Sequence, residues 1–189
     1  MSDTYLARDI VVLEGLDTVR KRPGMYIGGT DADGLHHLLW EVVDNAVDEV
    51  MNGHATTITV TLEDDGLTAS VADNGRGIPI DLHPQHGKSA LELVLTTLHA
   101  GGKFDHKSYR TAGGLHGVGA SVVNALSERL IAWVRREGRE FYMSFKRGEP
   151  EGDIAVTREP DETGTKVKYW PDPDICETVE FDSDPRKVR

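Results

Sequence analysis

The chain has 189 residues, of which 38% are hydrophobic and 28% charged, which is ordinary for a globular protein and enough to bury the core of a single domain. Its formal net charge of −11 repels phosphate backbones, so the chain by itself is not expected to bind nucleic acid strongly. It contains neither an apolar run of membrane-spanning length nor a signal-peptide pattern. Its single cysteine, Cys176, excludes an internal disulfide and fits a reducing cytoplasm.

The first third of the chain predicts an arm followed by two helices. Residues 1–9 are polar and predict an arm, and residues 10–21 predict a short helix that Pro23 ends. Residues 34–52 predict a five-turn helix, because apolar residues recur there at helical spacing in a stretch without proline. Gly53 follows at the position where glycine commonly ends a helix.

Three polar residues of that long helix share one stripe. His37, Glu41 and Asn45 are four residues apart, so their side chains lie above one another on the same side of the helix. Such a stripe is usually a solvated polar face. The alternative is a general base, its orienting partner and a metal ligand that point into one site, and the rest of the chain must decide between the two.

The middle of the chain predicts a hairpin and a second helix. Residues 56–62 alternate and are rich in β-branched side chains, residues 64–66 form a turn signal, and residues 67–72 supply the returning strand. Residues 89–99 predict a helix, with Ser89 at the position of an N-terminal cap.

The last third predicts a small helix and then an antiparallel meander. The helix covers residues 120–126, and the strands cover 130–136, 140–146, 153–157 and 164–170. Helices in the first part and strands in the second suggest a two-layer α+β sandwich. The tail after Pro171 carries little signal of a core.

Asp73 ends an apolar strand and begins a glycine-rich turn that runs to Pro79. An ordinary turn would explain the Asn-Gly step that follows it. A carboxylate at the end of a buried strand needs a hydrogen-bond donor, however, and the exocyclic amine of a purine is one. Gly75 and Gly77 would let a flat base approach the backbone closely.

A second glycine-rich stretch, residues 113–119, comes directly before the small helix. The exposed N–H groups at the start of a helix attract anions, and Lys103 and Arg110 supply cations in the same segment. The stretch is either simply flexible or a lid that closes over a ligand.

Several other motifs can be rejected. Gly87-Lys88-Ser89 resembles the end of a Walker A motif, but position 82, where the first glycine is required, is Leu82. Position 80 is Ile80, so Gly75 and Gly77 are not a dinucleotide fingerprint. The histidines do not have zinc-ligand spacing, and no G-x-S-x-G element of a serine hydrolase occurs.

Taken together, three motifs resemble the nucleotide-binding boxes of the GHKL ATPases: Glu41-x-x-x-Asn45, Asp73-x-Gly-x-Gly77 and Gly113-Gly-Leu-His-Gly-Val-Gly119. Blocks at 19–28 and 98–105 narrow the resemblance to the N-terminal ATPase domain of the B subunits of bacterial type II topoisomerases, without separating DNA gyrase from topoisomerase IV. The resemblance implies the Bergerat fold, a two-layer α/β sandwich with a mixed, mostly antiparallel sheet and helices on one face.

The resemblance also implies catalytic roles. Glu41 would be the general base that activates water against the γ-phosphate of ATP, and His37 would orient or polarise it. Asn45 would be the protein ligand of Mg²⁺. Asp73 would accept a hydrogen bond from the adenine amine, with Thr165 assisting through ordered water.

Further nucleotide-binding residues follow from the same resemblance. Gly77, Ile78 and Pro79 would line the base, and Arg76 and Arg136 would border the mouth of the pocket.

The phosphate side of the site is expected to consist of the glycine-rich stretch and residues before it. It would comprise Lys103, Tyr109, Gly114, Leu115, His116, Gly117, Val118 and Gly119. Tyr5 in the arm would reach into the site of a second copy, so that nucleotide binding and dimerisation are one event.

The expected organisation is an arm at 1–9, an ATPase domain at 10–171 and an acidic tail at 172–189 that leads toward a transducer domain not present in the chain. Such a chain would bind Mg-ATP and aminocoumarin-type inhibitors but hydrolyse ATP poorly alone. In the complete protein, ATP would close a clamp that drives DNA strand passage together with the cleavage subunit, and DNA would be bound only in that complex.

Other GHKL classes remain as alternatives. A MutL-like repair ATPase or an Hsp90-like chaperone would keep the fold, but the blocks at 20–28 and 102–105 argue against both. A histidine-kinase catalytic domain would need no hydrolytic base at Glu41. The last alternative is a purely structural module, which ATP would not stabilise.

Overall fold

The computed structural model describes residue 6, residues 14–100, residues 119–182 and residue 184. The described helices are α1 (Leu16–Lys21), α2 (Gly24–Ile27), α3 (Ala32–Met51), α4 (Ala90–Thr96) and α5 (Gly119–Ala125). The described strands are β1 (Ile58–Leu62), β2 (Ala69–Asp73), β3 (Ser127–Arg136), β4 (Arg139–Lys146), β5 (Glu149–Pro150), β6 (Ala155–Arg158) and β7 (Gly164–Pro171). None of these helices combines the length and the apolar character needed to cross a membrane.

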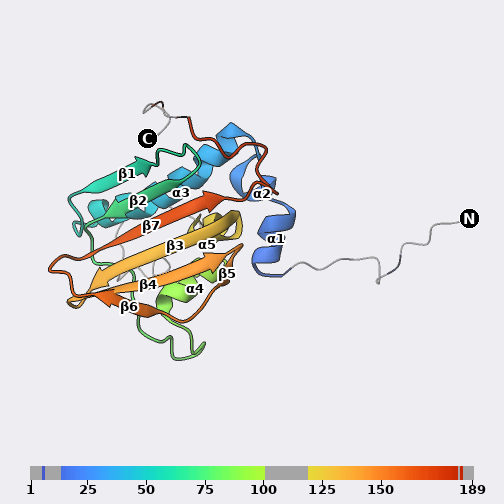
Figure 1. The fold of residues 1–189 in the computed structure, drawn as a ribbon. Helices are drawn as coiled ribbons and strands as arrows, with labels where there is room; N and C mark the ends of the chain where they lie inside the picture. Colours follow the sequence, from blue (N-terminus) through green and yellow to red (C-terminus); the bar gives the residue numbers. More distant parts are fainter. Residues whose placement is uncertain (1–5, 7–13, 101–118, 183, 185–189) are drawn as a thin grey trace, which may run out of the picture.

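The strands form one sheet in the order β1-β2-β7-β3-β4-β5, with β6 also paired to β4. The helices pack on one face of this sheet, so the predicted two-layer α+β sandwich is confirmed (Figure 1). Two details differ from the prediction. Every ladder between described strands is antiparallel rather than mixed. The last strands are not a simple meander either, because β7 returns to lie between β2 and β3.

Helix α3 crosses behind the sheet and supplies much of the core (Figure 1). It begins two residues before the predicted start, because the Asp31 side chain caps it by accepting from the Gly34 N–H at 3.1 Å. A Cβ at Gly34 would lie 2.1 Å from the Gly29 carbonyl oxygen, so this first turn needs glycine. At the other end Gly53 has a φ of +77°, the left-handed conformation that ends many helices.

Two short helices also differ from their predicted extents. Of the predicted helix 10–21, residues 10–13 lie outside the described residues, and Glu14 and Gly15 are not helical. In α4 the Ser89 hydroxyl accepts from the Glu92 N–H at 3.1 Å, which confirms the predicted cap. The helix ends at Thr96, three residues before the predicted end.

The segment after β7 packs closely on the domain, contrary to the prediction of little core signal. Phe181 is buried, with its ring centroid 6.1 Å from those of both His36 and Tyr169. Cys176 is buried as well, and desolvation raises the pKa of its thiol to about 11, so the thiol stays protonated at neutral pH. The core therefore depends on residues beyond the last strand.

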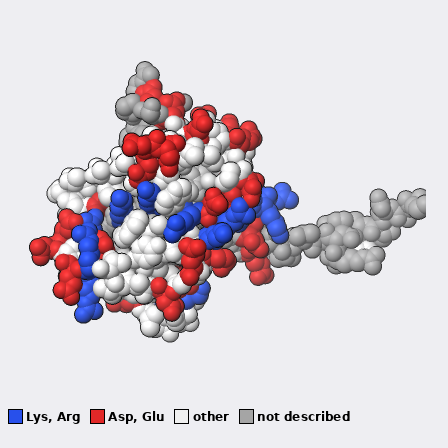
Figure 2. Space-filling model, in the orientation of Figure 1, with Lys and Arg blue, Asp and Glu red and all other residues white. Residues whose placement is uncertain are grey.

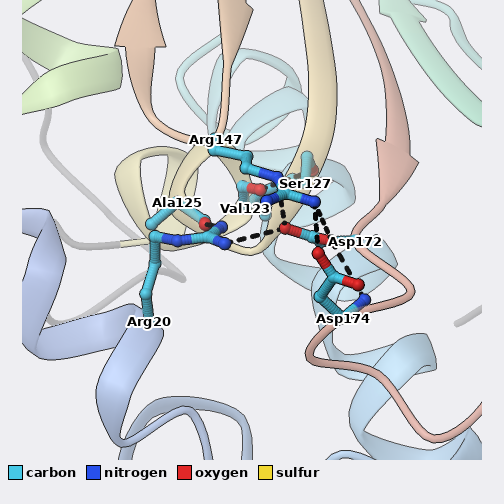
Figure 3. Close-up of polar contacts among 7 residues, drawn as sticks. All are labelled: Arg20, Val123, Ala125, Ser127, Arg147, Asp172 and Asp174. Carbon is cyan, nitrogen blue, oxygen red and sulfur yellow. Dashed lines mark hydrogen bonds and ion pairs between the residues drawn. The ribbon is translucent and has the colours of Figure 1, made fainter.

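Asp172, the first residue after β7, is fully buried between two arginines (Figure 3). Its Oδ2 atom lies 2.8 Å from Arg20 Nη2, and 3.1 Å from Arg147 Nε. Arg20 also donates to the carbonyl of Ala125 at 2.6 Å. The cluster joins α1, the end of α5 and the turn after β4.

Candidate active site

The polar stripe of α3 places two predicted catalytic side chains in contact. His37 Nε2 lies 3.3 Å from Glu41 Oε1, and both side chains are partly exposed. The spacing of four residues on a regular helix brings them together, as expected. Asn45 follows one turn later on the same side, and its side chain is half-buried.

Glu41 also lies against the first residue of α5. A Cβ placed on Gly119 would be 2.1 Å from Glu41 Oε2 and 3.1 Å from the Glu41 Cβ. Any side chain at Gly119 would therefore have to displace the Glu41 carboxylate, where the end of the glycine-rich stretch meets α3. The sequence alone did not reveal this contact, because nothing local links residues 41 and 119.

Asp73 is the last residue of β2, and its carboxylate is held by the backbone. The Oδ1 atom accepts from the Gly75 N–H at 2.8 Å and from the Thr165 N–H at 3.4 Å. Desolvation by burial raises the pKa of Asp73, and the nearby negative charge of Glu49 adds to this, while the two backbone hydrogen bonds oppose it. Among the described residues both hydrogen bonds end on Oδ1, which leaves Oδ2 to accept from a ligand.

The position of β7 between β2 and β3 brings Thr165 to Asp73. Gly164 has a φ of +144°, and a Cβ there would lie 2.1 Å from the Asp73 carbonyl oxygen. Thr165 Oγ1 accepts from the Ile78 N–H at 3.2 Å, which ties the turn after β2 to β7. The structure thus unites Asp73, Ile78 and Thr165, three predicted adenine-site residues.

The turn after β2 is equally crowded. Gly77 has a φ of +76°, and a Cβ on it would lie 2.9 Å from the Arg135 carbonyl oxygen. Arg136 Nη1 donates to the Gly77 carbonyl at 3.2 Å, so these two predicted residues also meet. Pro79 is exposed, and no described contact joins it to the others.

Sequence reasoning missed Glu49, which holds this turn against α3. Its carboxylate accepts from Arg76 Nη2 at 2.8 Å and from Arg76 Nε at 3.2 Å. A Cβ on Gly75 would lie 2.7 Å from Glu49 Oε2, so Gly75 leaves room for this carboxylate. A signal existed, since Glu49 is the next position, four residues after Asn45, on the same stripe.

The remaining predicted site residues lie outside the described residues. They are Tyr5, Lys103, Tyr109, Gly114, Leu115, His116, Gly117 and Val118. Their assignment stays a prediction, and Gly119 is the described end of the glycine-rich stretch.

The chain is similar to known proteins over most of its length. The family model described as "Histidine kinase-, DNA gyrase B-, and HSP90-like ATPase" matches residues 30–175. The B subunit of DNA gyrase from Archaeoglobus fulgidus is 60% identical over 181 residues, which is 94% of this chain and 28% of the relative. Its counterpart from Thermotoga maritima is 55% identical over 182 residues, 96% of this chain and 28% of the relative. The chain thus spans about a quarter of these proteins.

A solved structure is similar over most of the chain. It is the 43K ATPase domain of Thermus thermophilus gyrase B in complex with an aminocoumarin, with a TM-score of 0.80 and 46% sequence identity. The match covers 92% of this chain and 43% of that one.

Proposed function

We propose that this chain binds and hydrolyses Mg-ATP as the ATPase domain of a gyrase B-like protein. The basis is that the chain belongs to the family of histidine kinase-, DNA gyrase B- and HSP90-like ATPases. The relatives described above carry the gyrase name at 55–60% identity. This similarity does not favour the MutL-like and Hsp90-like alternatives.

The observation that carries the proposal is the Asp73 carboxylate. One of its oxygens is fixed by the backbone N–H groups of Gly75 and Thr165, and its pKa is raised mainly by burial. A partly dry, oriented acceptor at a strand end is suited to the exocyclic amine of adenine. Gly77 and Ile78 then border the base, with Arg76 and Arg136 at the mouth.

Hydrolysis is assigned to the stripe on α3. Glu41 would take the proton of the attacking water, while His37, 3.3 Å away, orients the carboxylate. The described residues contain no group of three His, Cys, Asp or Glu side chains that could hold a metal alone. Asn45 fits a Mg²⁺ ion held largely by nucleotide phosphates and water, and that ion would neutralise phosphate charge.

The functions of the whole protein are part of the same proposal. Lys103 and Gly114 to Gly119 would hold the phosphates, and Tyr5 would enter the site of a second copy when ATP closes the dimer. With a cleavage subunit and DNA, closure would drive strand passage. An aminocoumarin would compete with ATP here, by analogy with the Thermus thermophilus complex.

The adenine assignment predicts that Asp73→Asn loses nucleotide but keeps the fold. The asparagine oxygen can still accept from Gly75 and Thr165, but its NH₂ group would face the adenine amine, donor against donor. Leaving such a pair unsatisfied costs about 1–3 kcal/mol, or roughly 5–150-fold in affinity. Isothermal titration calorimetry with a non-hydrolysable ATP analogue measures this, with Asp64→Asn in the exposed hairpin turn as the control. Equal affinity in both variants would refute the assignment.

Thermal unfolding gives an independent readout of the same variant. Because the folded state raises the pKa of Asp73 above 3.8, the folded protein binds this proton more tightly than the unfolded chain. The charged carboxylate therefore lowers stability above the folded pKa, and this cost disappears as the pH falls toward 3.8. Asp73→Asn should raise the melting temperature at pH 7, by an amount that shrinks on acidification.

A further inference from the structure

No described helix covers the face of the sheet opposite α3, and the side chains of this face come from alternate positions of β3, β4 and β7 (Figure 1). Leu130, Ala132 and Val134 of β3 are buried toward the helices, so the residues between them point the other way. In register, Arg129 lies opposite Trp170, and Trp133 lies opposite Lys166. This helix-free face has no part in the site proposed above.

Positive charge is concentrated on the helix-free face although the chain is strongly acidic. Six cations extend from its strands: Arg129, Arg135, Lys146, Arg158, Lys166 and Lys168. Figure 2 shows Lys and Arg in an interrupted band across the middle of this face, with Asp and Glu mainly toward its rims. The net charge of −11 therefore hides a local basic surface.

Part of this charge lacks a partner among the described residues. Lys166 makes no ion pair with any of them. Arg135 pairs with Glu162 through Nη1, and only its buried Nε atom finds no hydrogen-bond acceptor in the same set. Lys166 and Arg135 line a shallow cavity of about 380 Å³, together with Trp133, Glu140 and Arg158. The cavity thus offers donors to an anion, with one indole in its wall. Glu140 neutralises Arg158, to which its carboxylate is bonded at 2.8 Å, and so leaves Lys166 to meet an anion there.

Aromatic rings alternate with these cations. Lys166 Nζ lies 5.7 Å from the centroid of Trp133, whose ring is 5.8 Å from that of Tyr142. Lys168 Nζ and Arg129 Cζ lie 5.2 Å and 5.7 Å from the Trp170 centroid. At such partly exposed sites a cation–π contact is worth about 0.5–1 kcal/mol, so Lys166 can leave its ring for a phosphate at little cost. Lys168 and Arg129 would also give up ion pairs, at 2.9 Å with Glu63 and at 4.0 Å with Glu151.

We propose that this helix-free face binds a single strand of DNA. Flat rings and cations on one sheet face match a ligand that alternates planar bases and phosphates, since bases stack on aromatic side chains and phosphates pair with Lys and Arg. A duplex keeps its bases stacked internally and would leave the rings unused, and so would an acidic peptide. The inference is independent of the ATP site, because the two lie on opposite faces of the sheet.

Fluorescence anisotropy of a labelled 12-nucleotide oligothymidine tests the proposal. Binding to the 189-residue chain should weaken with salt, and Lys166→Ala/Lys168→Ala should reduce the slope of log affinity against log salt by about 1.4, or 0.7 per lost phosphate contact. The matched control is Lys21→Ala/Arg22→Ala, which removes the same charge from exposed positions at α1. An equal loss in both double variants, or no binding at all, would overturn the proposal.

The aromatic contribution separates a single strand from other polyanions. Trp133→Leu leaves the charge unchanged and should weaken oligothymidine binding about tenfold, with the fold checked by the melting temperature. If that variant unfolds, Trp170→Leu is measured in the same way. The proposal fails if a 12-base-pair duplex or polyglutamate binds as tightly as oligothymidine, or if a folded tryptophan variant binds as the original chain does.

Discussion

Replacing Glu41 with glutamine should lower the rate of ATP hydrolysis by about 10²–10⁴-fold, the usual contribution of a general base. Glutamine keeps the size of the side chain and its contacts with His37 and Gly119, but its amide cannot take a proton from water. Nucleotide affinity should change little, because the proposed adenine contact is at Asp73 and not at Glu41. Single-turnover phosphate release at high protein concentration gives the rate, and calorimetry gives the affinity.

Asp33→Asn is the matched control, since it removes one carboxylate from the exposed first turn of the same helix. It should leave both the rate and the affinity near those of the unchanged chain. His37→Ala should lower the rate less than Glu41→Gln does, because the proposed role of His37 is only to orient the base. Full turnover by Glu41→Gln would remove Glu41 as the base, and another group would have to activate the water.

The sequence predicted this part of the site because its signals are local. A period of four residues places His37, Glu41 and Asn45 on one side of a helix, whatever the tertiary structure. A strand with alternating apolar residues that runs into Asp73 and a glycine turn is also readable in a short window. For these elements the predicted and observed positions agree within a few residues.

The remaining features depend on contacts between distant residues. No local pattern shows that β7 returns between β2 and β3, yet this pairing brings the Thr165 N–H to Asp73. The resemblance to a known family, rather than any spacing, supplied Thr165. Glu49 lies on the same side of the helix as the polar stripe of α3, which the sequence reveals. Its ion pair with Arg76, however, depends on where the turn after β2 packs.

The segment after β7 was misjudged for the same reason. It is rich in Asp and Pro, which is typical of a solvated tail, and only the folded structure reveals what its charges meet. Asp172 is buried because two arginines, one before and one after the central helix in sequence, converge on it (Figure 3). Composition cannot distinguish such a carboxylate from an exposed one.

Asp172→Ala should therefore be the most destabilising single change among the charged residues discussed. Removing one partner of a buried ion pair costs about 3–5 kcal/mol, because the other charge stays buried. Arg147 is 40% exposed at its side chain, so solvent screens part of this loss. We expect about 3 kcal/mol, or a fall of roughly 6–12 °C in the melting temperature of a domain of this size.

Asp174 provides the comparison that isolates burial from charge. Its side chain is 68% exposed and pairs with the same arginine, Arg147, at 2.5 Å. Asp174→Ala should cost no more than about 1 kcal/mol, because exposed ion pairs contribute little. If thermal denaturation shows equal midpoints for the two variants, the buried cluster does not hold α1, the end of α5 and β7 together. If Asp172→Ala alone lowers the midpoint, the packing of α1 against the end of α5 depends on a residue beyond the last strand.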